Sequence, residues 1–576
     1  DRFTSRTDSP ILTYSHTLQN HQGHRLALSH DYSGQAATAQ SPLVLLCPGY
    51  GTTQQQYVAV AYALAGTGLQ VLRYDHSRHI GLSDGDPSHT TFTSMEDDLD
   101  AVLAFVRTQW PRAPLTLLAP DLCGRIALRR QDWQRQLHRL ILLNPTLDLQ
   151  DCLFSLHQRD LVQEHLAGAR LGLGNLLGLP LDIDHFLADA VAAQYTNAAA
   201  LQEELSHCAT NVVILTAGDA APDCAIPAPS PSVLSDTMNR LGARARRVSL
   251  TPPILATGGL TPSLLTASSQ QLIQLCRPGH TPQEPEAIVT PTLAQTTAAR
   301  ARVELDRLRI TYSVGTAGRE RLWNTYSDLA PTLDDLPAHW HTVDQLYQLL
   351  QPLDGNLTIL DVGCGLHAFA RLLLLNLSYR LRAQTWRPGA LLQYVGTDFS
   401  PMALHQAREA TGRALQHVEQ LFSGRLSGAT PIHRQWVLSR STEALPFADH
   451  SFNRIVANHS LTFARSPLHV LRELFRVLKP GGKLVISGFT PSTDVARLYR
   501  QALPELGLNA FTGESRTTMN RMGQCCMALR IGQLHGLEEE DLHGYLSQVT
   551  PLPPRFVRAL SGQLLLAAAE KPDSAG

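Results

Sequence analysis

The sequence predicts two α/β domains in tandem, and three observations support this prediction. The chain has 576 residues, which is more than a single hydrophobic core of ordinary size organises. Two apolar, strand-like runs at residues 114–119 and 357–362 each end in a sharp turn that leads into a helix-like segment. Residues 277–291 are rich in proline and polar side chains, which is typical of a surface connection. We expect a first domain over residues 1–290, a linker with lid helices over 291–350, and a second domain over 351–576.

Composition argues against several classes of function. The net charge of −2 and the pI near 7.0 give no overall field that would attract nucleic acid or an acidic membrane. No window holds 18 consecutive apolar residues and the first 20 residues lack an apolar signal core, so we expect a cytoplasmic protein without a membrane span. The nine cysteines and 24 histidines show none of the spacings of metal sites, and we predict no metal.

The elements of the first domain follow one another as strand and helix. A buried-strand run within residues 41–51 opens into a Pro/Gly loop, a helix pattern covers 57–66, and a second strand covers 71–75. A helix with apolar periodicity spans 95–109. The strand at 114–119 then runs into Asp121 and a further helix, which is the strand, sharp turn and helix arrangement of a nucleophile elbow.

The sequence around this elbow resembles that of a known family. Residues 73–85, RYDHSRHIGLSDG, are similar to the acyl transferase (thioesterase) of the bacterial bioluminescence fatty-acid reductase system, an α/β-hydrolase that removes acyl chains from carrier protein. The likeness spans about half of the chain. The family has serine at the centre of the elbow, where this sequence has Asp121, and a histidine in the region of residues 247–260, where this sequence has none. The region of its acid, residues 218–223, is also altered.

The resemblance therefore implies an α/β-hydrolase domain that has lost acyl-transfer chemistry, with Asp121 marking a vestigial elbow. Two alternatives stay open, in which Asp121 itself is the nucleophile of an acyl hydrolase or Cys123 is a substitute thiol. The segment 161–201 lies where this fold inserts its lid, and it either covers an acyl chain or simply packs as helices.

The second domain begins with the run LDVGCG at residues 360–365. A strand followed by a glycine turn lets backbone N–H groups approach a ligand at the start of the next helix. A second strand, 394–398, ends in the acid Asp398, which is placed to accept hydrogen bonds from ribose hydroxyls. A strand at 452–458, a helix at 468–478, and the turn 479–482 into the strand 483–487 follow. The tail, at 556–560 and 564–569, is expected to add antiparallel strands.

This ordered set resembles the class I S-adenosylmethionine-dependent methyltransferases, in particular the branch of malonyl-carrier-protein and quinone-pathway enzymes. The resemblance covers residues 354–490 and implies a Rossmann-like fold with S-adenosyl-L-methionine as cofactor. The residues that it assigns to cofactor binding are Asp361, Gly363, Gly365, Asp398, Phe399, Ser441, Thr442 and Asn458. Two departures stand out, since Leu366-His367 replaces the third glycine and Ser441 stands where an acid commonly caps the adenine amino group.

Candidate acceptor-facing residues lie on the following strand end and on the lid. His459 is the best candidate for removing or orienting a proton, although it could equally be a packed or capping residue. A carboxylate acceptor would need no base. Trp323 and Tyr326, with Trp340 and Tyr347, either cover cofactor or acceptor or belong to the core.

We therefore predict a methyltransferase that acts on a small-molecule acceptor, acyl or polyketide-derived, free or bound to a carrier protein. The degenerate first domain would bind that substrate or a biosynthetic partner protein. Alternatives are an acyl thioester hydrolase that uses Asp121 and a non-enzymatic scaffold. The sequence does not identify the methyl acceptor, the pathway or the oligomeric state.

Overall fold

The chain forms two compact units in a computed structural model. The first comprises Asp1–Tyr312 with Asp494–Ile531, and the second comprises Ser313–Thr493 with Gly532–Gly576. The structure describes residues 10–34, 40–217, 229–250, 272–277, 299–308 without 302 and 306, 315–383, 390–421, 432–439, 442, 444–491, 493–560 and 562–573. Within these residues, no helix combines the length and the apolar character needed to cross a membrane.

The first unit is built on an eight-stranded sheet. Its order is β1 (Ile11–Gln19), β2 (Arg25–Ser33), β4 (Gln70–Tyr74), β3 (Leu43–Leu46), β5 (Leu115–Pro120), β6 (Leu137–Leu143), β9 (Val212–Ala217) and β10 (Ala245–Leu250). The first two strands pair antiparallel to their neighbours, and from β4 onward all pairs are parallel. The carboxyl ends of β4, β3 and β5 therefore lie side by side at one edge of the sheet.

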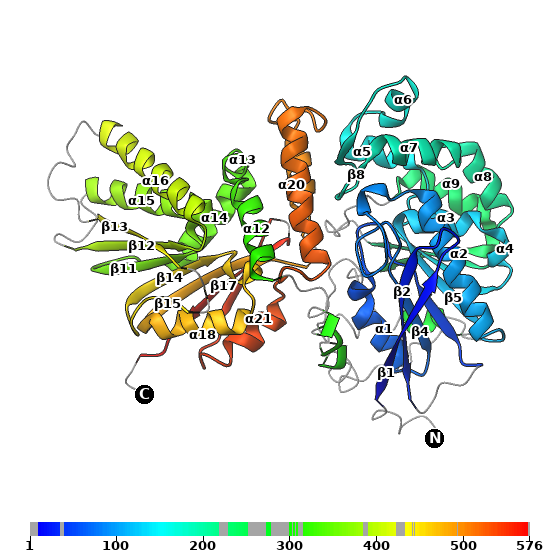
Figure 1. Ribbon diagram of the computed structural model, residues 1–576, viewed down its shortest axis with the longest axis horizontal. Coiled ribbons are helices and arrows are strands. Elements are labelled where there is room, and N and C mark those ends of the chain that lie inside the picture. The colour runs from blue at the N-terminus through cyan, green and yellow to red at the C-terminus, as the bar shows by residue number, and fades with distance from the viewer. Residues whose placement is uncertain are drawn as a thin grey trace. The chain divides into compact units, whose positions relative to one another are not determined.

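Helices cover both faces of this sheet (Figure 1). Because alternate strand residues point to opposite faces, the apolar strands divide between two cores. One core joins the sheet to α2 (Phe92–Gln109) and α3 (Asp121–Arg129), and the other joins it to α1 (Val58–Ala65). The unit also contains α4 (Gln131–Gln134), α5 (Leu149–His157), α6 (Leu161–Leu166), β7 (Leu173–Asn175), β8 (Pro180–Asp182), α7 (Ile183–Ala192), α8 (Ala198–Ser206) and α9 (Pro231–Leu241).

A segment from late in the chain completes the first unit. It contains α19 (Val495–Ala502) and α20 (Gly513–Arg530). In the sequence, this segment lies between two strands that belong to the sheet of the second unit. Phe511, Met527 and Ile531 pack against the core of the first unit, and buried Arg500 donates a hydrogen bond to Asn175 at 3.2 Å. Sequence patterns do not indicate that this segment belongs with the first half of the chain.

The second unit is built on a seven-stranded sheet. Its order is β13 (Ile432–Leu438), β12 (Leu392–Asp398), β11 (Leu357–Val362), β14 (Phe452–Asn458), β15 (Leu478–Phe489), β17 (Leu564–Glu570) and β16 (Arg555–Ala559). The first five strands are parallel, and the two tail strands close the sheet antiparallel, as the sequence predicts. The predicted turn 479–482 lies inside β15 as an irregularity in its pairing with β14.

Helices lie on both faces of this second sheet (Figure 1). The helices α14 (Pro337–Leu350), α15 (Ala368–Arg382) and α16 (Pro401–Leu421) cover one face, and α18 (Pro467–Val477) and α21 (Glu539–Leu546) cover the other. The short helices α12 (Thr316–Ser327), α13 (Ala330–Asp334) and α17 (Ser460–Phe463) complete the unit. The predicted fold class, two α/β domains, is confirmed, although residues 494–531 belong to the first unit.

Candidate functional sites

The glycine turn of the second unit follows β11 in the middle of the sheet. Gly363 has φ +73°, a left-handed conformation that L side chains rarely adopt. A Cβ at this position would lie 2.6 Å from the Ser460 hydroxyl, and one at Gly365 would lie 2.8 Å from the Ala403 Cβ. A side chain at either position would collide with neighbouring protein atoms, so the packing around the turn requires glycine at both positions.

Asp398 ends the neighbouring strand β12 and faces this turn. Its carboxylate accepts hydrogen bonds from the backbone N–H groups of Gly365 at 3.1 Å and Ser400 at 2.9 Å. The side chain is buried, and burial raises its pKa to about 6 although the two backbone donors oppose that shift. At neutral pH the group is therefore an anion that the turn itself holds in place.

A further donor to Asp398 comes from α12, a helix in the region that is predicted to form a lid. The Trp323 indole N–H donates to the carboxylate at 3.1 Å, and the side chain is 1% exposed. Its ring atoms lie 3.5 Å from the Cβ position of Gly363 and 3.4 Å from that of Gly365. Trp323 thus covers the turn and occupies a hydrogen-bonding position on the predicted ribose acid. The sequence placed Trp323 on the lid without showing this contact.

His459 follows β14 in a left-handed conformation, with φ 59°, and is buried. Its Nε2 lies 3.4 Å from the Tyr326 hydroxyl, and its ring centroid lies 4.3 Å from that of Phe489. Burial, with a smaller contribution from His339, lowers its pKa to about 3. The imidazole is consequently neutral at physiological pH and a weak base, and its aromatic neighbours form an apolar wall.

The other predicted cofactor residues have different surroundings. Phe399 lies near the indole, with its ring centroid 5.9 Å from that of Trp323. Asp361 instead accepts a hydrogen bond from the Tyr394 hydroxyl at 2.7 Å, which links β11 to β12. Burial raises the pKa of Asp361 to about 7. Asn458, at the end of β14, accepts a hydrogen bond from the Ser487 hydroxyl, while Thr442 is half-buried. Ser441 lies outside the described residues.

The elbow of the first unit has the predicted geometry. Asp121 begins α3 directly after β5 and has φ 39°, the strained turn that lifts the central side chain of an elbow out of the sheet. Its carboxylate accepts from the Tyr50 N–H, at 3.0 and 3.1 Å to the two oxygens, and from the Leu122 N–H at 2.5 Å. These two backbone groups correspond to the donors of an oxyanion hole. The carboxylate therefore occupies the place where an oxyanion would be stabilised.

The described surroundings of Asp121 hold no proton relay to it. Burial raises the pKa of this carboxyl to about 6, although hydrogen bonds from Tyr50 and Leu122 oppose the shift. Among the described residues no histidine forms a hydrogen bond with it, and His79 instead accepts from the Gly51 N–H at 3.0 Å. The altered acid region at 218–223 and residues 251–260, which are part of the region where the family has a histidine, lie outside the described residues.

Comparisons with known proteins agree with both halves of the fold. Residues 38–219 match the family described as serine aminopeptidase, S33, and residues 360–486 match the methyltransferase domain family. The chain joins an α/β-hydrolase domain to a methyltransferase domain. The predicted likeness to α/β-hydrolases and to methyltransferases is thereby confirmed, and the first unit contains the hydrolase domain and the second the methyltransferase domain.

Three curated relatives match parts of the chain. The biotin biosynthesis bifunctional protein BioHC of Teredinibacter turnerae is 28% identical over 30% of this chain and 27% of its own length. The malonyl-[acyl-carrier protein] O-methyltransferase of Erwinia pyrifoliae is 32% identical over 27% of this chain and 48% of its own. The acyl transferase of Vibrio campbellii is 25% identical over 20% of this chain and 37% of its own. The chain thus spans less than half the length of each of these three relatives.

Proposed function

We propose that the methyltransferase domain binds S-adenosyl-L-methionine with its ribose on Asp398 and its methionine end over Gly363 and Gly365. Asp398 carries this proposal, because a buried carboxylate at a parallel strand end, beside a turn that admits only glycine, is what a ribose diol requires. The bound cofactor supplies an activated methyl group. The protein then has to align the acceptor and exclude water, which is the task of a lid.

The glycine turn and Asp398 fit this cofactor on one condition. Trp323 hydrogen-bonds to the carboxylate that the ribose hydroxyls need, and it covers both glycines. Cofactor binding therefore requires the indole to leave Asp398, and α12 would act as a lid that exchanges one partner of the carboxylate for another. Gly365 and Ser400 keep the carboxylate oriented throughout this exchange, since their N–H groups belong to the turn and to the strand end.

The acceptor is proposed to be a carboxylate of an acyl chain, free or bound to a carrier protein. His459 supports this choice, because an imidazole with a pKa lowered to about 3 is too weak a base to activate a hydroxyl or amine. A carboxylate needs no deprotonation at neutral pH. His459 would then orient the acceptor through Nε2, which now faces Tyr326. The resemblance to a malonyl-[acyl-carrier protein] O-methyltransferase points to the same class of acceptor.

The hydrolase domain is proposed to bind the acyl chain or its carrier without cleaving it. Asp121 supports this proposal, because its carboxylate takes both N–H groups that would stabilise a tetrahedral intermediate. A nucleophilic aspartate would need those groups free for the substrate oxygen and would need a histidine to activate water. Nothing in the described geometry favours the alternative of an acyl hydrolase that uses Asp121.

Methyl transfer from labelled S-adenosyl-L-methionine to a panel of acyl acceptors tests the proposal. The panel should pair each free dicarboxylic acid with the same acyl group on a carrier protein and with fully methyl-esterified forms of both, which have no free carboxylate. We expect label in the free or carrier-bound acid, none in the pre-formed ester, and none with Asp398→Ala. Label that appears equally in the ester panel, or transfer that survives Asp398→Ala, would contradict the proposal.

A further inference from the structure

Three side chains from separate parts of the sequence meet beneath the hydrolase elbow. Cys47 follows β3, His76 follows β4, and Cys123 lies in the first turn of α3 after β5. Since β4, β3 and β5 are adjacent parallel strands, their carboxyl ends bring these residues together. All three are fully or almost fully buried, with exposures of 0, 1 and 0%.

The ligand atoms have the separations of a metal site. His76 Nε2 lies 3.4 Å from the Cys123 Sγ and 3.9 Å from the Cys47 Sγ, and all three atoms lie within 4.8 Å of one another. Bond lengths of about 2.3 Å to sulfur and about 2.0 Å to nitrogen place tetrahedral ligand atoms roughly 3.5 to 3.8 Å apart. The observed separations therefore leave room for one ion with little movement of the side chains.

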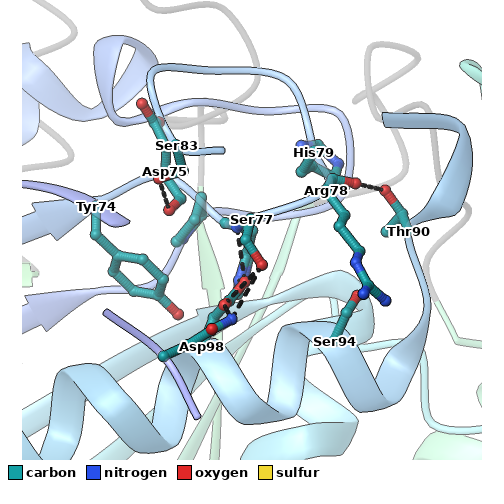
Figure 2. A network of polar contacts seen from close by, with 12 residues as sticks. Tyr74, Asp75, Ser77, Arg78, His79, Ser83, Thr90, Ser94 and Asp98 are labelled. Atoms are coloured by element: carbon teal, nitrogen blue, oxygen red, sulfur yellow. Dashed lines mark hydrogen bonds and ion pairs between the residues drawn. The ribbon is translucent and has the colours of Figure 1, made fainter. Parts of the chain in front are cut away.

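A carboxylate behind the histidine fixes its direction. His76 Nδ1 lies 3.3 Å from Asp98, which is buried and also accepts hydrogen bonds from the Ser77 N–H at 2.7 Å, the Ser77 hydroxyl at 2.9 Å and the Asn20 amide at 2.7 Å. Figure 2 shows Asp98 on its helix reaching up to Ser77. Carboxylates hold metal-binding histidines in this way, with the ring N–H donating to the carboxylate and the other nitrogen free for the metal.

Without an ion, both thiols of this cluster have a hydrogen-bond acceptor within reach, because the Cys123 and Cys47 Sγ atoms lie 3.2 and 3.7 Å from the Pro48 carbonyl oxygen. With Nδ1 donating to Asp98, the imidazole Nε2 has one lone pair that faces both sulfurs, and it can accept a hydrogen bond from one of the thiols. A divalent ion would use that lone pair and both sulfurs, and two thiolates would cancel its charge in a site that excludes water. The Tyr74 hydroxyl, 3.1 Å from the Cys47 Sγ, can donate to a thiolate there.

We propose that Cys47, His76 and Cys123 bind a zinc ion. Thiolate and imidazole ligands select zinc among the common divalent cations, and within the described part of the chain the set supplies three protein ligands. The ion would join the loop that carries Tyr50 to the helix that carries Leu122, and so fix the two backbone donors that hold Asp121. The spacing of these residues in the sequence does not reveal the site, because the fold alone brings them together.

Metal analysis of the full-length protein tests this proposal. Protein produced in zinc-supplemented medium is expected to carry about one zinc per chain by plasma mass spectrometry. The double variant Cys47→Ala/Cys123→Ala should lose it, whereas Cys276→Ala, a matched change at a buried cysteine in the other core of the same unit, should retain it. Equal zinc in the wild type and the double variant would overturn the proposal, since the metal would then lie elsewhere.

Two further measurements keep the proposal testable if the double variant folds poorly. Cobalt added to metal-free wild-type protein should produce thiolate-to-cobalt charge-transfer absorption at one equivalent, and its absence would overturn the proposal. Asp98→Asn keeps all three ligands and should weaken zinc affinity about tenfold to a hundredfold in a chelator competition. Unchanged affinity in Asp98→Asn, or a Cys47–Cys123 disulfide shown by a thiol count two below the wild-type sequence, would also count against it.

Discussion

Replacing Trp323 with phenylalanine should strengthen cofactor binding. In the structure the indole N–H donates to the Asp398 carboxylate at 3.1 Å, so the ribose hydroxyls have to displace that bond. A hydrogen bond to a charged group contributes about 1.5 to 3 kcal/mol, and water replaces part of it when the indole leaves. Phenylalanine keeps an aromatic ring over Gly363 and Gly365 but removes the donor. We expect affinity to rise about tenfold, which corresponds to about 1.4 kcal/mol.

Calorimetric titration with S-adenosylhomocysteine at pH 8, where Asp398 is ionised, measures this effect. The matched control is Trp340→Phe. Trp340 lies in the same unit, but its indole N–H donates to the backbone carbonyl of Asp334 at 2.7 Å and not to the Asp398 carboxylate. The control should bind as the wild type does. If Trp323→Phe binds no more tightly than the wild type, the indole does not compete with the ribose and the proposed role of the lid is wrong.

Four other predictions follow from the same geometry. Affinity for S-adenosylhomocysteine should fall about tenfold between pH 7 and pH 5, because burial raises the pKa of Asp398 to about 6 and protonation removes a hydrogen-bond acceptor. The control Asp361→Asn removes the other carboxyl whose pKa is raised and should leave the pH profile of binding unchanged. A flat wild-type profile would count against Asp398 as the ribose ligand. His459→Gln should retain methyl transfer to a carboxylate within about tenfold, and a loss of a thousandfold or more would show that the histidine acts as a base. Intact-mass spectrometry after incubation with acyl thioesters should show no ester at Asp121, and an acyl adduct there would restore the hydrolase alternative. A chain of residues 1–312 should have a much lower unfolding temperature than the full-length protein by circular dichroism, since it lacks Phe511, Met527 and Ile531, which pack on its core. An unfolding temperature equal to that of the full-length protein would contradict the assignment of residues 494–531 to the first unit.

Sequence patterns predicted the regular parts of both domains because those depend on local periodicity. The strand expected at 452–458 is β14, and the elbow and the glycine turn have the strained backbone that their residues imply. The antiparallel tail strands also follow from alternation of apolar residues near the end of the chain. Each of these features lies within one continuous stretch of sequence, where apolar periodicity and turn residues can be recognised directly.

Contacts between distant segments could not be predicted in this way. Trp323 reaches Asp398 across 75 positions, and Cys123 meets His76 across 47, with no spacing that reveals either pair. The helices α19 and α20 read as ordinary elements of the second domain, yet their apolar side chains complete the core of the first unit. Asp361 was assigned to the cofactor from its motif, whereas the Tyr394 hydroxyl holds it within the sheet. Its role in cofactor binding remains a prediction.

Calorimetric titration of the full-length protein and of Asp398→Ala with S-adenosylhomocysteine tests the central claim most directly. Binding at one site per chain in the wild type, reduced at least a hundredfold in the variant, is the expected result. The Asp361→Asn variant should bind within a few-fold of the wild type, because that carboxyl is held by Tyr394. No saturable binding to the wild type, or equal binding to Asp398→Ala, would show that this strand end does not hold the methyl donor.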